Sequence, residues 1–313
     1  LSVALAGSPS SGTLVKKSAN VAIAGLVFSA GAQSAVKVTS ITLTCQAALA
    51  SNAAFATAAA KDACLNRVSS LSLWNGSTQV GTSKAPGSSG GAATISNTNL
   101  DIPAGQSVNL TVQATFGSTA STTSPFDQIA VGIANDSDIQ AQDADSNTIT
   151  ASRSAGVEAQ ADGTPSVVQT IRNSGVVTYN TDSNPVSTLV VAGKDVWVPF
   201  ASYKATAQYE AMEIDRVTVF ASGTAAGTVH NSDSAVFTSV AVASNGAVKG
   251  SDILGAGGTS TKDIDLSANK IIVPKDGSVN FQLWAKVSNI QSSSSVSGAT
   301  TGVHRSGMSP TMG

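Results

Sequence analysis

The sequence predicts an all-β protein made of two tandem domains, and three observations support this prediction. A thirteen-residue stretch at 102–114, IPAGQSVNLTVQA, returns at 273–285 as VPKDGSVNFQLWA. Apolar and polar residues alternate through both copies, which is typical of a strand with one face in a core. Pro103 and Pro274 lie 171 positions apart, a spacing that fits whole domains and is too long for a solenoid repeat.

The repeat extends through most of each half of the chain. Each half has about seven or eight short apolar segments at even spacing, separated by turns rich in Gly, Ser and Thr. This spacing indicates an immunoglobulin-like or related Greek-key β-sandwich in each half. We expect each copy of the repeated stretch to form a strand–turn–strand hairpin. Pattern matching pairs Tyr203 with Phe28, at an offset of 175 positions.

One irregularity also recurs. The alternation of apolar residues is broken by a three-residue step from Val38 to Ile41 and again from Ile214 to Val217. An extra residue in a strand produces such a step, so we expect a β-bulge at both places.

The domain limits follow from composition. Domain one is expected at 1–155 with an Ala-rich helical insertion at 46–63, a linker at 156–165 rich in Gly, Ala, Ser and Asp, and domain two at 166–313. Nothing near the C-terminus matches the last strand of domain one. Domain two is therefore expected to be shortened, or to be completed by a strand from elsewhere.

The two cysteines, Cys45 and Cys64, flank the insertion. We expect a disulfide that joins the ends of two adjacent strands and stabilises domain one by roughly 3 kcal/mol. Such a bond implies an oxidising compartment outside the cytoplasm. The alternative is a pair of unpaired thiols in the core.

Composition excludes some partners. Charged residues make up 12% of the chain, against about 25% in a typical soluble protein, and weak repulsion favours association between copies. The net charge is −2 with no basic cluster, which argues against nucleic acid. No apolar run approaches the length of a membrane span. The chain opens on a strand without Met, so we expect an extracellular or cell-surface protein that has lost its signal segment.

Catalytic motifs are missing from the sequence, and we expect no enzyme activity. The two histidines, His230 and His304, lie in polar segments far apart, and no Gly-x-Ser-x-Gly elbow occurs.

No cofactor is expected, except that one acidic segment could bind Ca²⁺. The acidic segment NDSDIQAQDADSN offers hard oxygen ligands from Asp136, Asp138, Asp143, Asp145 and Asn147. It lacks the glycine and the distal glutamate of an EF-hand loop, so a solvated acidic turn is the other interpretation.

Three segments match the N-glycosylation sequon, at Asn75, Asn109 and Asn135. In a chain rich in Ser and Thr, chance matches are the alternative.

Subunit contacts are expected at two places. Trp197 and Trp284 alternate with apolar neighbours and should point out of the core of domain two, towards another protein or, as the less favoured choice, a sugar. The first strand, with Leu1, Val3 and Leu5, is a candidate for donation to a neighbouring copy. Its alternative is an ordinary first strand of its own domain.

The motif apolar-Pro-x-Gly-x-Ser-Val-x-Leu, seen here as IPAGQSVNL and VPKDGSVNF, together with the low-charge composition, resembles β-sandwich repeat proteins of microbial cell surfaces. These include S-layer-like proteins, fimbrial or filament subunits and large surface proteins of small-celled bacteria. The resemblance implies a structural subunit of an extracellular filament, pilus or surface layer, with copies of itself as partners. Contact with a cell or host surface is a further implied partnership. The alternative is a monomeric adhesin or carbohydrate-binding module.

Overall fold

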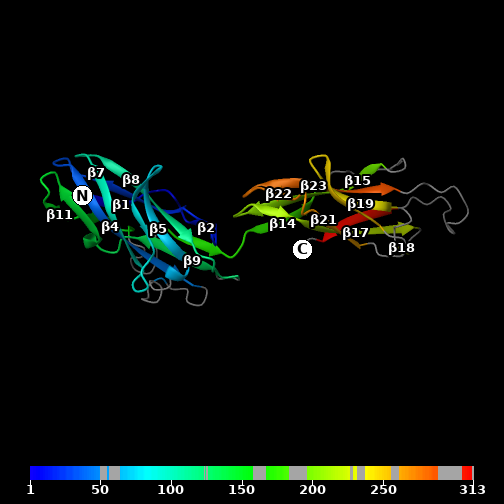
Figure 1. Ribbon diagram of the computed structural model, residues 1–313, viewed down its shortest axis with the longest axis horizontal. Helices are drawn as coiled ribbons and strands as arrows, with labels where there is room; N and C mark the ends of the chain where they lie inside the picture. The colour runs from blue at the N-terminus through cyan, green and yellow to red at the C-terminus, as the bar shows by residue number, and fades with distance from the viewer. Residues whose placement is uncertain are drawn as a thin grey trace, which may run out of the picture. The chain divides into compact units, whose positions relative to one another are not determined.

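A computed structural model gives the fold (Figure 1). It describes residues 1–49, 55, 64–122, 124, 126–157, 167–182, 196–225, 228–230, 237–254, 261–287 and 305–311, with only the backbone for 221–225, 228–230, 287 and 305–311. The described residues form strands and short 3-10 turns, and the chain divides into unit 1, Leu1–Ser174, and unit 2, Gly175–Gly313. The all-β prediction is confirmed.

Unit 1 contains two sheets. The first has the order β12-β1-β3-β8-β5-β6, with bounds Ser152–Arg153, Ser2–Leu5, Val21–Ser29, Ser107–Phe116, Val68–Asn75 and Thr78–Lys84. The second has the order β11-β10-β4-β9-β13-β2, with bounds Thr148–Ile149, Ile139–Asp143, Val36–Ala48, Asp127–Gly132, Gln169–Arg172 and Gly12–Val15. The strand β7, Ala92–Ile102, pairs with β4, and the 3-10 turns are η1, Cys64–Asn66, and η2, Asp136–Asp138.

One apolar core lies between the two sheets of unit 1. Leu26 and Leu110 come from the first sheet, Ile41 and Leu43 from the second, and all four are almost fully buried in the same cluster. Neighbouring residues on each strand face away, as the alternation predicts. This arrangement is consistent with a β-sandwich.

The described residues of unit 2 form a five-stranded sheet and two smaller ones around their own core. The large sheet has the order β14-β15-β23-β19-β20, with bounds Val176–Thr181, Trp197–Gln208, Ser278–Val287, Phe237–Ser244 and Ala247–Ile253. The others are β16-β22, Met212–Ile214 with Ile271–Val273, and β18-β17-β21, Thr228–His230, Arg216–Ala225 and Thr261–Asp265, with β24, Arg305–Thr311, paired to β17.

The two units share strand order and irregularities. The order β1-β3-β8-β5-β6 recurs as β14-β15-β23-β19-β20. The pairing of β3 with β8 skips Ile23, and that of β15 with β23 skips Phe200 at the same place. The predicted bulge after Val38 is confirmed, since the β4–β7 register shifts between Val38 and Ser40. In unit 2 the corresponding strand is interrupted at Asp215, between β16 and β17.

The predicted pairing of Tyr203 with Phe28 is wrong. Leu110 and Phe281 are equivalent in the repeated stretch, and they pair with Leu26 and Tyr203 respectively. Tyr203 therefore corresponds to Leu26, at an offset of 177 positions. A slip of two residues leaves every side chain on its own face, so apolar alternation does not reveal it.

The repeated stretch does not form a hairpin. β7 ends at Ile102 and pairs with β4 in the second sheet, while β8 begins at Ser107 in the first. The turn between them, with Gly105 at a φ of 69°, therefore carries the chain from one sheet to the other. Ile102 and Leu110 consequently reach one core from opposite sheets.

The unit boundary lies later than composition suggests. β13 follows the expected linker and lies antiparallel to β9 and parallel to β2, so it belongs to unit 1. The units accordingly divide after Ser174, whereas the sequence places the start of domain two at 166. Residues 158–166, most of the expected linker, lie outside the described residues.

The expected helical insertion at 46–63 is largely outside the described residues. Its first three residues continue β4 to Ala48 and pair with β9, so they are strand. Phe55 is buried in a small cluster with Ala48, Ala130 and Val168. This contact ties the insertion to the end of β4 and β9.

Candidate functional site

The large sheet of unit 2 has one face in the core and one face directed away from it. On β23, Phe281, Leu283 and Ala285 are fully buried, while Asn280, Gln282, Trp284 and Lys286 alternate with them on the other side. We call this second side the β23 face. It is the surface of unit 2 that carries both predicted contact tryptophans.

The two tryptophans occupy one end of the β23 face. Trp197 pairs across the sheet with Lys286, whose Nζ lies 4.9 Å from the centre of the indole ring. Trp284 lies two positions before Lys286 on β23 and donates its Nε1–H to Gln282 Oε1 at 2.9 Å. Both rings are partly exposed. Their predicted direction away from the core agrees with this placement.

Polar side chains from four strands surround the other end of the β23 face. They line two adjoining cavities of about 580 and 310 Å³. We call these together the polar furrow, and its side chains include Asn180, Asp182, Ser202, Lys204, Asn245, Asn280 and Gln282. Among the described residues, Val279 and Ala243 are the two apolar residues larger than glycine that line it.

Asp182 is the anchor of the furrow. Its backbone N–H donates to Ser202 O at 2.8 Å, which fixes the residue beside β15 just past the end of β14. Its Oδ2 accepts a hydrogen bond from Asn280 Nδ2 at 3.3 Å and a longer one from Ser202 Oγ at 3.5 Å. Ser244 Oγ donates to Asn280 O at 3.0 Å on the opposite side. The furrow therefore has a carboxylate held by neighbours on two strands.

The corresponding place in unit 1 has different residues. By strand register, Trp74 stands where Ala243 stands, since Trp74 pairs with Thr111 and Ala243 with Gln282. Gly25 stands where Ser202 stands, and a Cβ added to Gly25 would lie 2.2 Å from Ser8 O. In unit 1 the Trp74 indole donates its Nε1–H to Ser72 Oγ at 2.9 Å, and the backbone of Ser8 passes close to Gly25.

The furrow residues were not predicted from the sequence. Asp182, Lys204 and Asn245 come from three separate segments, and strand register brings them together. The one available signal was the repeat itself, because Trp74 and Gly25 have small or polar counterparts in unit 2.

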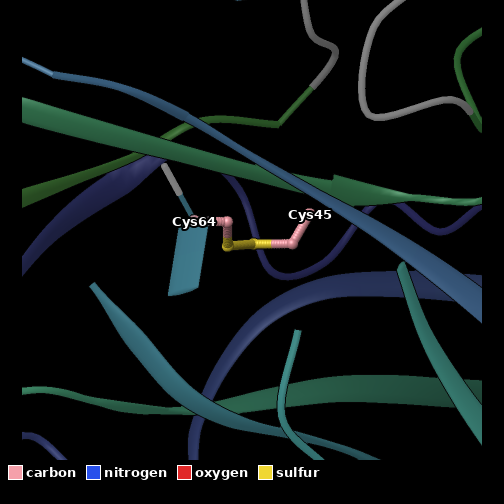
Figure 2. Close-up of a disulfide and its surroundings, with 2 residues drawn as sticks. All are labelled: Cys45 and Cys64. Carbon is pink, nitrogen blue, oxygen red and sulfur yellow. A yellow bond between two sulfur atoms is a disulfide. The ribbon is translucent and has the colours of Figure 1, made fainter. Parts of the chain in front are cut away.

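The predicted disulfide is present. Cys45 and Cys64 are joined and fully buried, with their Cα atoms 5.9 Å apart (Figure 2). Arg67 follows η1 and donates its Nε–H to Asp127 Oδ2 at 2.6 Å, and Ser121 N–H donates to the same oxygen at 2.8 Å. Asp127 is 1% exposed. The disulfide and this ion pair together fix the base of the insertion.

The acidic residues proposed for Ca²⁺ are separately engaged. Asp136 Oδ1 accepts from Arg153 Nε at 2.8 Å, and Asp138 Oδ2 accepts from Asn135 N–H at 2.8 Å. Asp143 accepts from the backbone N–H groups of Asp145 and Asn147 and closes the turn between β10 and β11. Within the described residues, no group of three or more His, Cys, Asp or Glu side chains lies close enough to hold a metal ion.

Hydrogen bonding by Asn147 lowers the pKa of Asp143 below its ordinary value of 3.8. The side-chain amide has the largest effect, followed by the backbone N–H of the same residue and that of Asp145. The carboxylate therefore acts as the acceptor of its turn.

The structure leaves the predicted glycosylation sites and the expected lack of catalysis untested. Asn75, Asn109 and Asn135 are exposed, and Asn135 also caps η2, so glycosylation stays a prediction. The side chains of both histidines lie outside the described part of the molecule, so the expectation of no catalysis also stays a prediction. Among the described residues, no helix is long and apolar enough to cross a membrane.

The first strand is hydrogen-bonded on both sides within unit 1. β1 pairs antiparallel with β3 and parallel with β12, and Val3 is fully buried. Leu5, at the end of β1, and Leu1, just before it, are partly buried. In this chain β1 is therefore an ordinary first strand of its own domain, which was the alternative to strand donation.

Comparison with known proteins gives no family. No family model matches the chain, and no curated protein matches it. Among solved structures, the chain is similar to the secreted serine protease VesC from Vibrio cholerae, at 8% identity and a TM-score of 0.16, over 96% of this chain and 49% of that one. The chain thus spans about half the length of that protease.

A second solved structure is a protein described as membrane anchored, from Corynebacterium diphtheriae. It is 10% identical to this chain at a TM-score of 0.20, over 93% of this chain and 84% of that one. At these TM-scores neither likeness carries an argument about fold or function.

Proposed function

We propose that the protein is a structural subunit of an extracellular assembly, a filament, pilus or surface layer, built from contacts between immunoglobulin-like β domains. The observation that carries the proposal is a difference in sheet edges. In unit 1, β12 covers the outer edge of β1 and β13 covers that of β9. Among the described residues, no strand covers the corresponding edges of β14 and β24 in unit 2.

Uncovered edges favour association. An edge strand presents unpaired N–H and C=O groups, and adding a strand from another chain satisfies them. β24 corresponds to β9 because β17 pairs with it where β4 pairs with β9. Because β1 is already paired on both sides within unit 1, Leu1–Leu5 is not the donor strand in this proposal. The acceptor edges are those of β14 and β24.

The β23 face supports the same proposal. Partly exposed Trp197 and Trp284, together with Ile253 at 69% exposure on β20, place apolar surface on the large sheet of unit 2. Exposed apolar surface of this kind is typical of protein contacts. The buried disulfide of unit 1 suits an extracellular setting.

Sedimentation velocity and electron microscopy of the purified chain test the proposal. We expect species larger than the 31.0 kDa monomer at high concentration and ordered polymers in the images. Thr178→Lys places a charge on the uncovered edge strand β14 and should reduce assembly, because charged residues protect sheet edges. Ser2→Lys, at the corresponding place on the covered strand β1, is the matched control and should leave assembly unchanged.

A monomeric adhesin or carbohydrate-binding module is the second candidate, and the polar furrow favours it. A discrete monomer at every concentration, with no polymers in the images, would support this candidate over the assembly subunit.

A further inference from the structure

We propose that the polar furrow of unit 2 binds a neutral polysaccharide chain, with Asp182, Lys204, Asn280 and Gln282 contacting its hydroxyl groups and Trp284 lying beside a sugar ring. This inference concerns a ligand site and does not depend on whether the protein assembles.

The furrow differs from the matched place in unit 1 by specific replacements. Ala243 stands where unit 1 has Trp74, and Ser202 stands where unit 1 has Gly25. Lys204 and Asp182 stand where unit 1 has Val27 and Ala6, as the strand pairing and the equivalent N–H to O hydrogen bonds show. Ser202, Lys204 and Asp182 make this place in unit 2 more polar, and Ala243 has a smaller side chain than Trp74.

The chemistry of the furrow matches hydroxyl groups. A sugar hydroxyl both donates and accepts, and the side-chain amides of Asn245, Asn280 and Gln282 do the same. Asp182 adds an acceptor and Lys204 adds donors. Trp284 Nε1 donates to Gln282 Oε1, which orients that amide. Side chains held in place by such bonds lose little conformational freedom when a ligand binds.

Charge and shape narrow the ligand class. Among the described lining residues there are one carboxylate and one ammonium group beside amides and hydroxyls, so these residues offer no excess charge to an anion or a cation. The same described residues include only Val279 and Ala243 as apolar side chains, which gives a bound peptide little apolar surface. From Asn280 to Trp284 the strand rises about 13 Å, which is longer than one sugar ring, and the partly exposed indole can stack on the apolar face of a ring.

Isothermal titration calorimetry of the full chain tests the site. The probes are neutral hexasaccharides of β-1,4-linked glucose, β-1,4-linked N-acetylglucosamine and α-1,4-linked glucose. We expect at least one to bind, and Asn280→Ala or Gln282→Ala to weaken binding about tenfold, the effect of losing one hydrogen-bonding side chain. Asn109→Ala and Thr111→Ala truncate the polar side chains at the matched positions of unit 1 and should leave binding unchanged.

A second variant separates the site from the fold. Ala243→Trp copies unit 1 and should block the furrow without removing a polar group, while the melting temperature confirms folding. The proposal is overturned if no hexasaccharide binds, or if the variants in unit 1 weaken binding as much as those in unit 2. A peptide that copies residues 167–174 is the last probe. The proposal is also overturned if this peptide binds, if Gln282→Ala abolishes its binding, and if no sugar binds. The β23 face would then be a protein contact.

Discussion

Unit 1 and unit 2 have the same five-stranded sheet, with one strand order and the same skipped residue at Ile23 and Phe200. The two units differ at the outer edge of this sheet and on its outward face. Unit 1 covers its outer strand with β12, carries Trp74 on its outward face, and has the backbone of Ser8 close to Gly25. Unit 2 leaves β14 uncovered by any described strand and opens the polar furrow.

This difference indicates a division of roles. The residues that close and lock a sheet gather in unit 1, where the disulfide and the Arg67–Asp127 pair lie. Unit 2 carries Trp197 and Trp284 on the β23 face, the polar furrow, and the edges of β14 and β24 that no described strand covers. Because both units share one scaffold, position-matched substitutions can test each part of the comparison.

The largest effect on this comparison should come from the buried ion pair of unit 1. Asp127→Asn leaves Arg67 without its charged partner, and breaking such a pair costs about 3–5 kcal/mol. Urea unfolding of the full chain measures the loss. Asp136→Asn breaks the more exposed pair with Arg153 and should cost less than about 1 kcal/mol. Equal losses in the two variants would contradict the role given to Asp127.

Loss of the disulfide should come next. Replacing both Cys45 and Cys64 by alanine should lower the stability of unit 1 by about 3 kcal/mol, because the bond closes a loop of 19 residues. Hydrogen exchange resolves the two units in one experiment. Protection should fall in β4 and β5 and stay constant in β15 and β23. A fall in β23 as large as that in β4 would show that the units do not unfold separately.

An intermediate effect is expected at the crossing over Gly25. Gly25→Ser copies the residue found in unit 2, but its Cβ would meet Ser8 O and Ala6 Cβ. Such overpacking costs about 1–3 kcal/mol, measured by thermal unfolding. Ser202→Ala in unit 2 adds no atoms and should change stability by less than about 1 kcal/mol. An undamaged Gly25→Ser protein would mean that the crossing of Ser8 is not tight.

The smallest effects concern one carboxylate in each unit. The Asn147 amide lowers the pKa of Asp143, and the Ser267 N–H and hydroxyl lower that of Asp265. The pKa of each carboxyl group is lower in the folded protein than in the unfolded chain. Each ionised carboxylate therefore stabilises the fold at pH values above the unfolded pKa. This stabilisation is lost as the pH falls through the folded pKa. Asn147→Ala should raise the pKa of Asp143 and leave that of Asp265 unchanged. Carbon NMR titration of the carboxyl groups distinguishes the two, and an unchanged Asp143 would contradict the assigned cause.

Much of the scaffold was predictable from the sequence. Alternation located β8 and β23, the three-residue step located the bulge after Val38, and the two cysteines located the disulfide. These features are local, so each leaves its own pattern in the chain.

Features that depend on pairing between distant strands were not predictable. The turn after Ile102 looks like a hairpin turn, but the sheet to which each strand belongs is decided by β4 and β3. The short β13 has no strong pattern, and its membership of unit 1 depends on β9 and β2. The polar furrow combines side chains from separate strands, so it follows only from the correct register.

Hydrogen exchange of the intact chain at low and at high concentration tests most directly whether unit 2 provides the association surface. The account predicts that protection of β14 and β24 rises with concentration, because strands from other copies cover their edges, while β1 and β9 are protected equally at both concentrations. A chain whose β14 and β24 exchange at the same rate at every concentration, or whose concentration-dependent protection lies in unit 1, would contradict it.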